Sequence, residues 1–222
     1  LHEIIICDDR SQDETPIILK KYCAHPLIKV RQSPPLPQGW IGKPHACHCL
    51  ASAASGDVLL FIDADVRIKP YGIHRIIDLM RHRSWDGQRS DIVTAVPHQH
   101  MVGRMEKLLL PLLLLSYTSW LPMIFVRLFQ TTKITAANGQ ILAITRTCYD
   151  QLGGFAAIRK HIVDDMALCR RAKEHAAHVL FADGQEIAQC RMYHSQKEIW
   201  EGFSKNIFHF RAFAPQKWDL FC

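Results

Sequence analysis

Asp63 and Asp65 are separated by Ala64 and directly follow an apolar run, Val58–Ile62. Such a run, with β-branched and aromatic members, predicts a strand that is buried on both faces. If the extended geometry continues past the run, both carboxylates point to the same side of the chain. Two carboxylates there are costly unless a positive charge lies between them, and divalent cations take oxygen ligands and often bridge to phosphates. The spacing therefore predicts a site for a metal and a nucleotide. Its alternative is an ordinary turn with two solvated acids.

Further charged residues stand where other predicted elements begin or end. Asp8 and Asp9 follow a second predicted strand, Glu3–Cys7. Lys43 lies at a junction between a loop and a helix, where the positive end of the helix adds to its attraction for an anion. Taken alone, a solvated lysine is the simpler interpretation of this position.

Two polar pairs stand in the second half of the chain. Asn138 and Gly139 precede the predicted strand Ile141–Ile144, and an Asn-Gly pair permits a sharp turn and a close approach of the backbone to a ligand. Asp164 and Asp165 open a predicted helix. Acids in a first turn are also ordinary N-terminal caps, so their position alone leaves a structural role open.

These residues are distributed over an alternation of strands and helices. The alternation predicts an α/β fold with a mainly parallel central sheet and flanking helices, in which ligands bind outside the carboxyl ends of the strands. The predicted strands are 3–7, 27–30, 58–62, 92–96, 141–144 and 179–182, and the predicted helices are 15–24, 44–56, 70–83 and 162–177.

The size and charge of the chain limit its class. Its 222 residues, of which 48% are hydrophobic, suffice for one large domain or two small ones. The net charge is +6, without a basic run or a nucleic-acid motif, so we expect no nucleic-acid partner. A moderate positive excess suits anionic ligands or a membrane surface. Leu1 enters a strand almost at once and Cys222 ends the chain in mid-pattern, which is typical of a piece of a longer protein.

The segment 104–130 contains the longest apolar stretch. Its central part, 108–126, has nineteen residues without a charge, and basic residues flank it. This length approaches that of a membrane span, but two prolines interrupt it, and a single crossing would separate the two halves of the chain. We expect it to dock in a membrane interface, with a buried core helix and a true span as alternatives. The tail, 189–222, mixes aromatic and basic residues and predicts an amphipathic segment.

The order of these features resembles the GT-A glycosyltransferases of family 2, over nearly the whole chain. Two segments look most like the membrane-associated branch that glycosylates lipids, which includes hopanoid- and carotenoid-linked glycosyltransferases and, more distantly, ceramide glucosyltransferase. These segments are Gly39–Pro44 and Trp200–Asn206. The motifs that carry the resemblance are Asp8-Asp9 after a strand, Gly42-Lys43-Pro44, Asp63-Ala64-Asp65, Asn138-Gly139, Asp164-Asp165 and an Arg-aromatic tail.

The resemblance implies the GT-A nucleotide-diphospho-sugar transferase fold and a donor site. It implies that Asp8 and Asp9 hold the base and ribose of the nucleotide, and that Asp63 contacts the ribose or a metal-bound water. Asp65 would bind Mg²⁺ or Mn²⁺ directly, and Lys43 would help to neutralise the diphosphate.

The resemblance also implies the catalytic and acceptor groups. Asp165 would be the general base that takes the proton from the acceptor hydroxyl, and Asp164 would belong to the nucleotide-sugar site. Asn138 and Gly139 would lie on the acceptor side, and Arg191 would contact the diphosphate.

The implied activity is inverting transfer of a hexose from a nucleotide sugar, with UDP as the expected nucleotide, to an isoprenoid or similar lipid at the cytoplasmic face of a membrane. Processive members carry a Gln-x-x-Arg-Trp motif, but here the nearest match, Gln189–Tyr193, has different spacing and a different last residue. A processive polysaccharide synthase domain and a non-catalytic membrane scaffold are the alternatives. The resemblance further implies one more strand and helix before Leu1, and membrane helices after Cys222.

Overall fold

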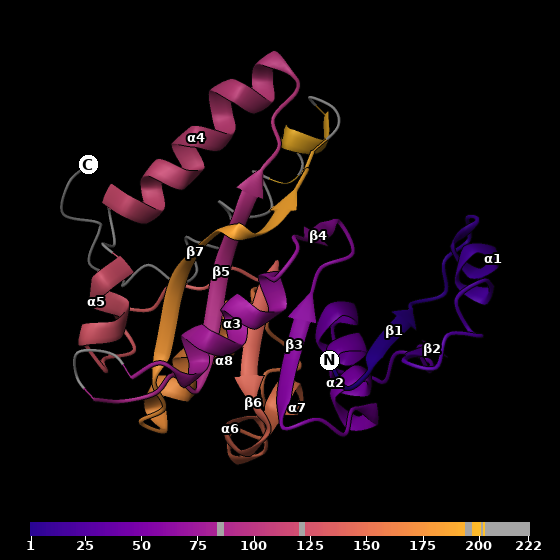
Figure 1. Ribbon diagram of the computed structural model, residues 1–222, viewed down its shortest axis with the longest axis horizontal. Coiled ribbons are helices and arrows are strands. Elements are labelled where there is room, and N and C mark those ends of the chain that lie inside the picture. Colours follow the sequence, from indigo (N-terminus) through magenta and orange to yellow (C-terminus); the bar gives the residue numbers. More distant parts are fainter. Residues whose placement is uncertain (84–86, 120–122, 194–196, 201, 203–222) are drawn as a thin grey trace.

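The computed structural model describes residues 1–83, 87–119, 123–193, 197–200 and 202. Its strands form a two-stranded sheet of β1 and β2 and a five-stranded sheet in the order β3-β6-β5-β7-β4 (Figure 1). The strands are β1 (Ile4–Asp8), β2 (Ile28–Gln32), β3 (Val58–Ile62), β4 (Val66–Ile68), β5 (Ile92–Gln99), β6 (Ile141–Thr145) and β7 (Val179–Cys190). The helices are α1 (Thr15–Lys20), α2 (Gly42–Ala53), α3 (Gly72–Arg81), α4 (Arg104–Ser119), α5 (Met123–Leu128), α6 (Arg146–Gln151), α7 (Gly154–Ala157) and α8 (Asp164–Glu174).

The apolar run that precedes the two acids forms β3, as its composition predicts. It pairs antiparallel with β6 and stands at one edge of the five-stranded sheet. The prediction that both faces are buried is wrong at its end, because Leu59 is 5% exposed but Ile62 is 39% exposed. An edge position leaves part of this strand open to solvent.

The alternation of strands and helices is confirmed, but the sheet is mixed rather than mainly parallel. In the five-stranded sheet β5 and β7 are parallel, whereas β6 is antiparallel to β3 and β5, and β4 is antiparallel to β7. A parallel neighbour requires a crossover that returns the chain to the starting end of the sheet. After α4 and α5, the chain instead re-enters the sheet beside the middle of β5, where Leu142 pairs with Thr94. From there β6 runs back toward the start of β5, so the two strands are antiparallel.

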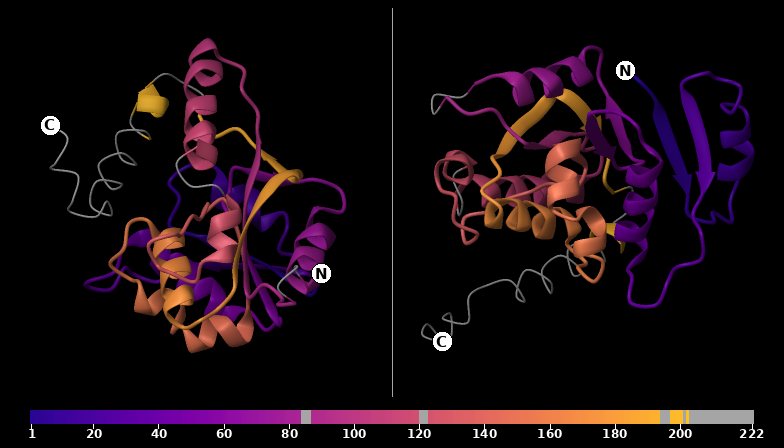
Figure 2. Two further views of the ribbon diagram at one scale, coloured as in Figure 1. Left: turned by 90° about the vertical axis from the view of Figure 1, so that its left-hand side faces the viewer. Right: turned by 90° about the horizontal axis from the view of Figure 1, so that it is seen from below.

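Helices cover both faces of the five-stranded sheet (Figure 2). On one face α3 packs through Ile76 and Met80 against Val93 and Ala95 of β5. The residues on either side of this pair in β5, Ile92 and Val96, pack in the cluster on the other face. This alternation is the period of two that a strand imposes on its side chains. The second cluster collects apolar residues from α2, α5, α6, α7 and α8.

The apolar segment 104–130 folds into α4 and α5. α4 continues for 16 residues through Pro111, and its Leu110 is buried against the chain that follows β7. Its other side is open, with Leu108 61% and Leu112 56% exposed. In the described part of the chain, no helix has both the length and the apolar character needed to cross a membrane.

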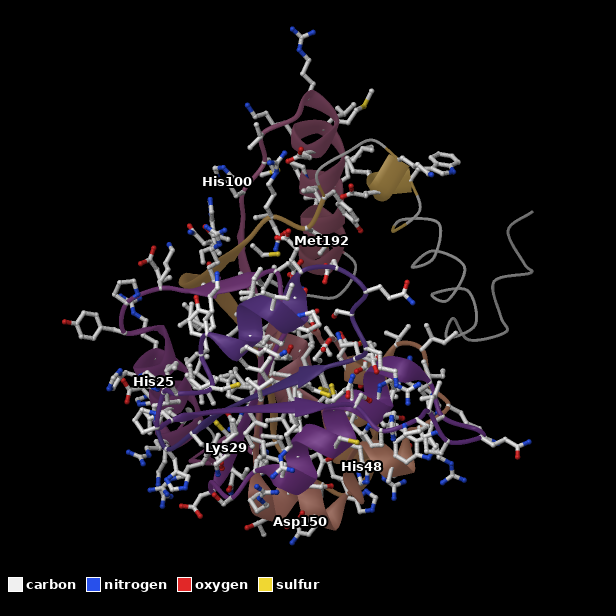
Figure 3. All side chains as sticks on the ribbon, turned by 90° about the vertical axis from the view of Figure 1, so that its right-hand side faces the viewer. His25, Lys29, His48, His100, Asp150 and Met192 are labelled. Carbon is white, nitrogen blue, oxygen red and sulfur yellow. The ribbon has the colours of Figure 1, made fainter. Side chains whose placement is uncertain are left out.

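The strand β7 extends further than its sequence predicts. It continues to Cys190, so the first two residues of the predicted amphipathic segment 189–222 belong to a strand. The chain then passes beside α4, where Met192, labelled in Figure 3, packs against the cluster that contains Leu110. Most of the predicted segment lies outside the described residues.

Lys173, near the end of α8, joins this helix to α5 and to the segment that follows α5. Its Nζ, on a side chain that is 4% exposed, donates to the carbonyl oxygens of Val126 at 2.7 Å and Phe129 at 2.9 Å, and to that of Ile134. We expect Lys173→Met to lower the free energy of unfolding by about 3 kcal/mol or more, because buried carbonyl groups lose a charged donor. Urea denaturation measures this change, with the exposed Lys133→Met as the control. A loss below about 1 kcal/mol would show that the ammonium is dispensable.

Candidate active site

Acids and a lysine from separate parts of the chain meet around Gly139. The Nζ of Lys43 lies 2.9 Å from Oδ1 of Asp63. A Cβ atom at Gly139 would lie 3.2 Å from Nζ of Lys43 and 3.4 Å from Oδ2 of Asp165. Because glycine has no side chain, the ammonium group of Lys43 and the carboxylate of Asp165 can approach one another at this position.

Lys43 is held in place because α2 is fixed at both ends. Before its first turn, the N–H of Ile41 donates to the carbonyl of Arg159 at 3.0 Å. At its last turn, the guanidinium of Arg146 satisfies carbonyl groups that a helix end leaves unpaired. These carbonyls belong to Ala51, Ala54 and Gly56, at 3.0, 2.7 and 3.3 Å.

The turn before β6 carries Gly139 into the site. The buried hydroxyl of Thr94 donates to the carbonyl of Asn138 and accepts from its N–H, both at 2.8 Å. The Oδ1 of Asn138 accepts from the N–H of Gln140 at 2.9 Å, so the Asn138 side chain serves the turn itself. The carbonyl of Gln140 in turn accepts from the N–H of Asp63 at 3.2 Å, which ties the turn to the end of β3.

The charges in this cluster alter one another's pKa. Burial raises the pKa of Asp165 to about 6, and the neighbouring Asp164 adds to the effect. Burial also raises the pKa of Asp164. For Lys43, burial opposes the charged form, but Asp164 and Asp63 outweigh it and raise the pKa of the ammonium. At neutral pH the site therefore holds a fixed positive charge beside a carboxylate of unusually high basicity.

Asp65 has a different partner. Its Oδ2 accepts from the thiol of Cys190 at 3.2 Å, and the sulfur accepts from Nε2 of Gln140 at 3.1 Å. Sequence reasoning missed Gln140 and Cys190. The position of Gln140 directly after the Asn-Gly turn could have indicated a role at the site. Nothing in the sequence around Cys190 distinguishes it from the other cysteines.

The residues predicted to bind the nucleotide have different surroundings in the structure. Asp9 lies at the first turn of α2, where a Cβ at Gly42 would be 3.7 Å from its Oδ2. Asp8 is 8% exposed, and its Oδ1 accepts from the N–H of Ser11 at 2.9 Å. Arg191 is engaged by α4, because its Nη2 donates to Oε1 of Glu106 at 3.2 Å. The structure therefore gives Arg191 a partner on α4, and its contact with the diphosphate stays a prediction.

Glu106 is a further residue that sequence reasoning missed. Its carboxylate accepts the N–H groups of Val102 at 2.9 Å and Gly103 at 3.1 Å, at the start of α4, as well as the guanidinium of Arg191. Its side chain is 5% exposed. These contacts join α4 to the residue that follows β7.

The acids after β3 suit a divalent cation. Within the described ranges, no group of three or more His, Cys, Asp or Glu side chains is arranged as a metal site. Mg²⁺ is commonly held by one or two carboxylates together with substrate phosphates rather than by a complete protein cage. Asp63 and Asp65 are hard oxygen donors of the kind that such an ion takes, and one oxygen of Asp63 already contacts Lys43, so a cation at this position stays a prediction.

A cavity of about 660 Å³ lies between β1, β2 and α2. None of the predicted site residues lines it. Its walls include Cys7, Val30, Arg31, His48 and Cys49, and Figure 3 shows His48 on α2. The lining is therefore a different set of residues from the cluster around Gly139.

Known proteins share the sequence pattern and the fold. The profile of Glycosyl transferase family 2 matches residues 1–166. The 4,4'-diaponeurosporenoate glycosyltransferase of Staphylococcus haemolyticus is 26% identical over 212 residues, which cover 92% of this chain and 53% of that protein. The enzyme of the same name from Staphylococcus aureus is 22% identical over 211 residues, with the same coverage. The chain thus spans about half the length of these relatives.

Among solved structures, S. aureus TarS 1-349 in complex with UDP-GlcNAc matches with a TM-score of 0.56 at 16% identity, over 89% of this chain and 51% of that chain. A mycobacterial protein matches with a TM-score of 0.52 at 18% identity, over 90% of this chain and 60% of that chain. The expected GT-A fold is confirmed by these neighbours together with the family match. With the family profile matching most of the chain, the protein belongs to glycosyl transferase family 2.

Proposed function

We propose that this chain is the catalytic part of an inverting enzyme that transfers a hexose from a nucleotide-diphosphate sugar to a lipid acceptor. The observation that carries the proposal is the meeting of Lys43, Asp63 and Asp165 around Gly139. A basic carboxylate that could take the acceptor proton and a cation that could neutralise a phosphate leaving group are the two groups that displacement at a sugar carbon uses, and their occurrence in one site supports the proposal.

The chemical step follows from these groups. The acceptor oxygen forms a bond to the anomeric carbon as the bond from that carbon to the diphosphate breaks, and the electron pair leaves with the diphosphate. Asp165 takes the proton of the acceptor hydroxyl, and Lys43 neutralises charge that develops on the diphosphate. Asp63 and Asp65 would hold Mg²⁺ or Mn²⁺, which supplies further charge neutralisation when bound. Attack opposite the leaving group inverts the configuration of the sugar.

The donor and acceptor classes are supported by the relatives. TarS was solved in complex with UDP-GlcNAc, which supports a UDP-sugar donor here. The relatives named 4,4'-diaponeurosporenoate glycosyltransferase support an isoprenoid acid or alcohol as the acceptor. Asp8 and Asp9 are our candidates for the base and ribose, and Asn138 and Gly139 for the acceptor side.

The proposal is tested by turnover of the full-length protein. UDP release from UDP-glucose and UDP-GlcNAc is measured with 4,4'-diaponeurosporenoate as the acceptor, in Mn²⁺, in Mg²⁺ and after chelation. We expect turnover that chelation abolishes and a product with one added sugar. A polymeric product would favour a processive synthase. Absence of both turnover and UDP binding by calorimetry would favour a scaffold and refute the proposal.

The pH dependence of this reaction should follow Asp165. With a pKa of about 6, its carboxyl becomes protonated below that pH, so kcat/KM is expected to fall as pH decreases through about 6. Asp164→Asn removes the like charge next to it and should move this acid limb to lower pH. A pH–rate profile of both proteins measures the limb, and an unmoved limb would assign it to another group.

We propose that the open side of α4 rests on an anionic bilayer. Its Met105, Leu108 and Leu112, at 42%, 61% and 56% exposed, follow helical spacing on one side. The exposed Arg104 and Lys107 lie beside them, and basic residues next to an apolar face are attracted to anionic lipid.

Membrane docking is measured by sedimentation with vesicles of phosphatidylglycerol and phosphatidylcholine. The double variant Leu108→Asp/Leu112→Asp should bind at least about tenfold more weakly, because two apolar side chains no longer enter the interface. Ile17→Asp on α1, at a position 63% exposed, is the matched control and should bind as the wild type does. Equal binding by all three proteins would remove α4 as the docking surface.

A further inference from the structure

Asp65 is an exposed residue whose carboxylate is nevertheless held by a buried thiol. Cys190, at 2% exposure, donates to Oδ2 of Asp65 at 3.2 Å. The sheet register explains the contact, since Val66 pairs with Cys190 where β4 meets β7. The last residue of β7 therefore lies across from the residue that follows Asp65.

Gln140 fixes the direction of this thiol. Its Nε2 donates to the sulfur at 3.1 Å, which leaves the S–H to point at Asp65. Its Oε1 accepts from Nε2 of Gln99 at 3.1 Å, and Gln140 itself is 5% exposed. Because the carbonyl of Gln140 also accepts from the N–H of Asp63, this residue contacts both acids, one directly and one through sulfur.

We propose that Gln140 and Cys190 are positioning residues that orient the Asp65 carboxylate toward a divalent cation; this inference rests on the proposed function. A thiol is a weak donor, and a carboxylate has about four lone-pair sites. The contact therefore sets the rotation of Asp65 while it leaves oxygen lone pairs for an ion. Partners of this kind behind a metal ligand are worth about 10–100-fold in metal affinity or activity.

The first experiment follows turnover against Mn²⁺ concentration in the full-length protein. Cys190→Ala should raise the Mn²⁺ concentration for half-maximal rate by about 10–100-fold, with little change in KM for the acceptor. Cys190→Ser supplies a hydroxyl donor and should restore most of the loss. Cys148→Ala removes another buried thiol, at 4% exposure in α6, and should behave as the wild type does. An unchanged Mn²⁺ requirement in Cys190→Ala would overturn the proposal.

The second experiment does not depend on turnover. The S–H stretching band of Cys190 is isolated as the infrared difference between the wild type and Cys190→Ser. We expect it to move to higher frequency in Asp65→Ala, where its acceptor is gone, and to move when Mn²⁺ and UDP are added to the wild type. A band that ignores Asp65→Ala overturns the positioning role even in an active enzyme. If the band shifts in Asp65→Ala but the wild type shows no turnover, the positioning contact stands and only the proposed function is refuted.

Discussion

Asp165→Asn is expected to lower turnover by about 10²–10⁴-fold, the range for loss of a general base, while the fold stays intact. The amide keeps the shape of the side chain and an oxygen that can accept from the N–H of Met166, as Oδ1 of Asp165 does at 2.8 Å. It cannot take a proton from the acceptor. Initial rates with saturating donor and Mn²⁺ measure the loss.

The same substitution should raise the melting temperature at neutral pH. The folded-state pKa of Asp165 lies at about 6, above the value of 3.8 for a free carboxyl, because burial disfavours its charge. The unfolded chain therefore gives up the proton first as pH rises, and the folded state loses stability between about pH 4 and 6. Above that window the neutral amide removes the cost, whereas at about pH 4 the two proteins should melt alike.

The matched control is Asp150→Asn, on the exposed side of α6 (Figure 3). It removes a carboxylate of the same size and should change neither rate nor melting temperature by much. Unchanged turnover in Asp165→Asn would assign proton removal to a different group. A melting temperature that falls sharply would mean that the carboxylate is structural.

Asp65→Ala should also lose at least about 10²-fold in rate, but in a different manner. Its loss removes a carboxylate that would hold the cation, so the remaining activity should respond little to added Mn²⁺ or to chelation. Asp165→Asn should keep the metal response of the wild type at a lower rate. Titration of both variants with Mn²⁺ separates the two roles, and an identical metal response in both would contradict the assignment of Asp65.

Local patterns in the sequence were sufficient for the parts of the fold that depend on neighbouring residues. The apolar run Val58–Ile62 becomes β3, and the helix predicted for 70–83 is α3. The acids that follow strands or begin helices also lie where those elements end or begin. Asp63 and Asp165 meet Lys43 around Gly139, which agrees with the rule that ligand sites form where such ends meet at one side of the sheet.

Features that depend on strand register and on distant charges were beyond the sequence. Cys190 contacts Asp65 because β4 pairs with β7 in one register, and no local pattern specifies that register. Arg191 pairs with Glu106, which lies 85 positions away in the chain, and no local pattern indicates that pair. The antiparallel direction of β6 was missed for a similar reason, because it depends on where the long connection with α4 and α5 returns the chain to the sheet.

The last residue of β7 and the residue that follows it contact different parts of the molecule. Cys190 holds an acid of the candidate metal site, and Arg191 holds the start of α4 through Glu106. If α4 rests on lipid, the height of the reaction centre above the bilayer is set by a rigid strand end rather than by a flexible tether. We therefore expect the enzyme to select acceptors by how far their reactive oxygen protrudes from the membrane, with the length of the buried tail of minor importance.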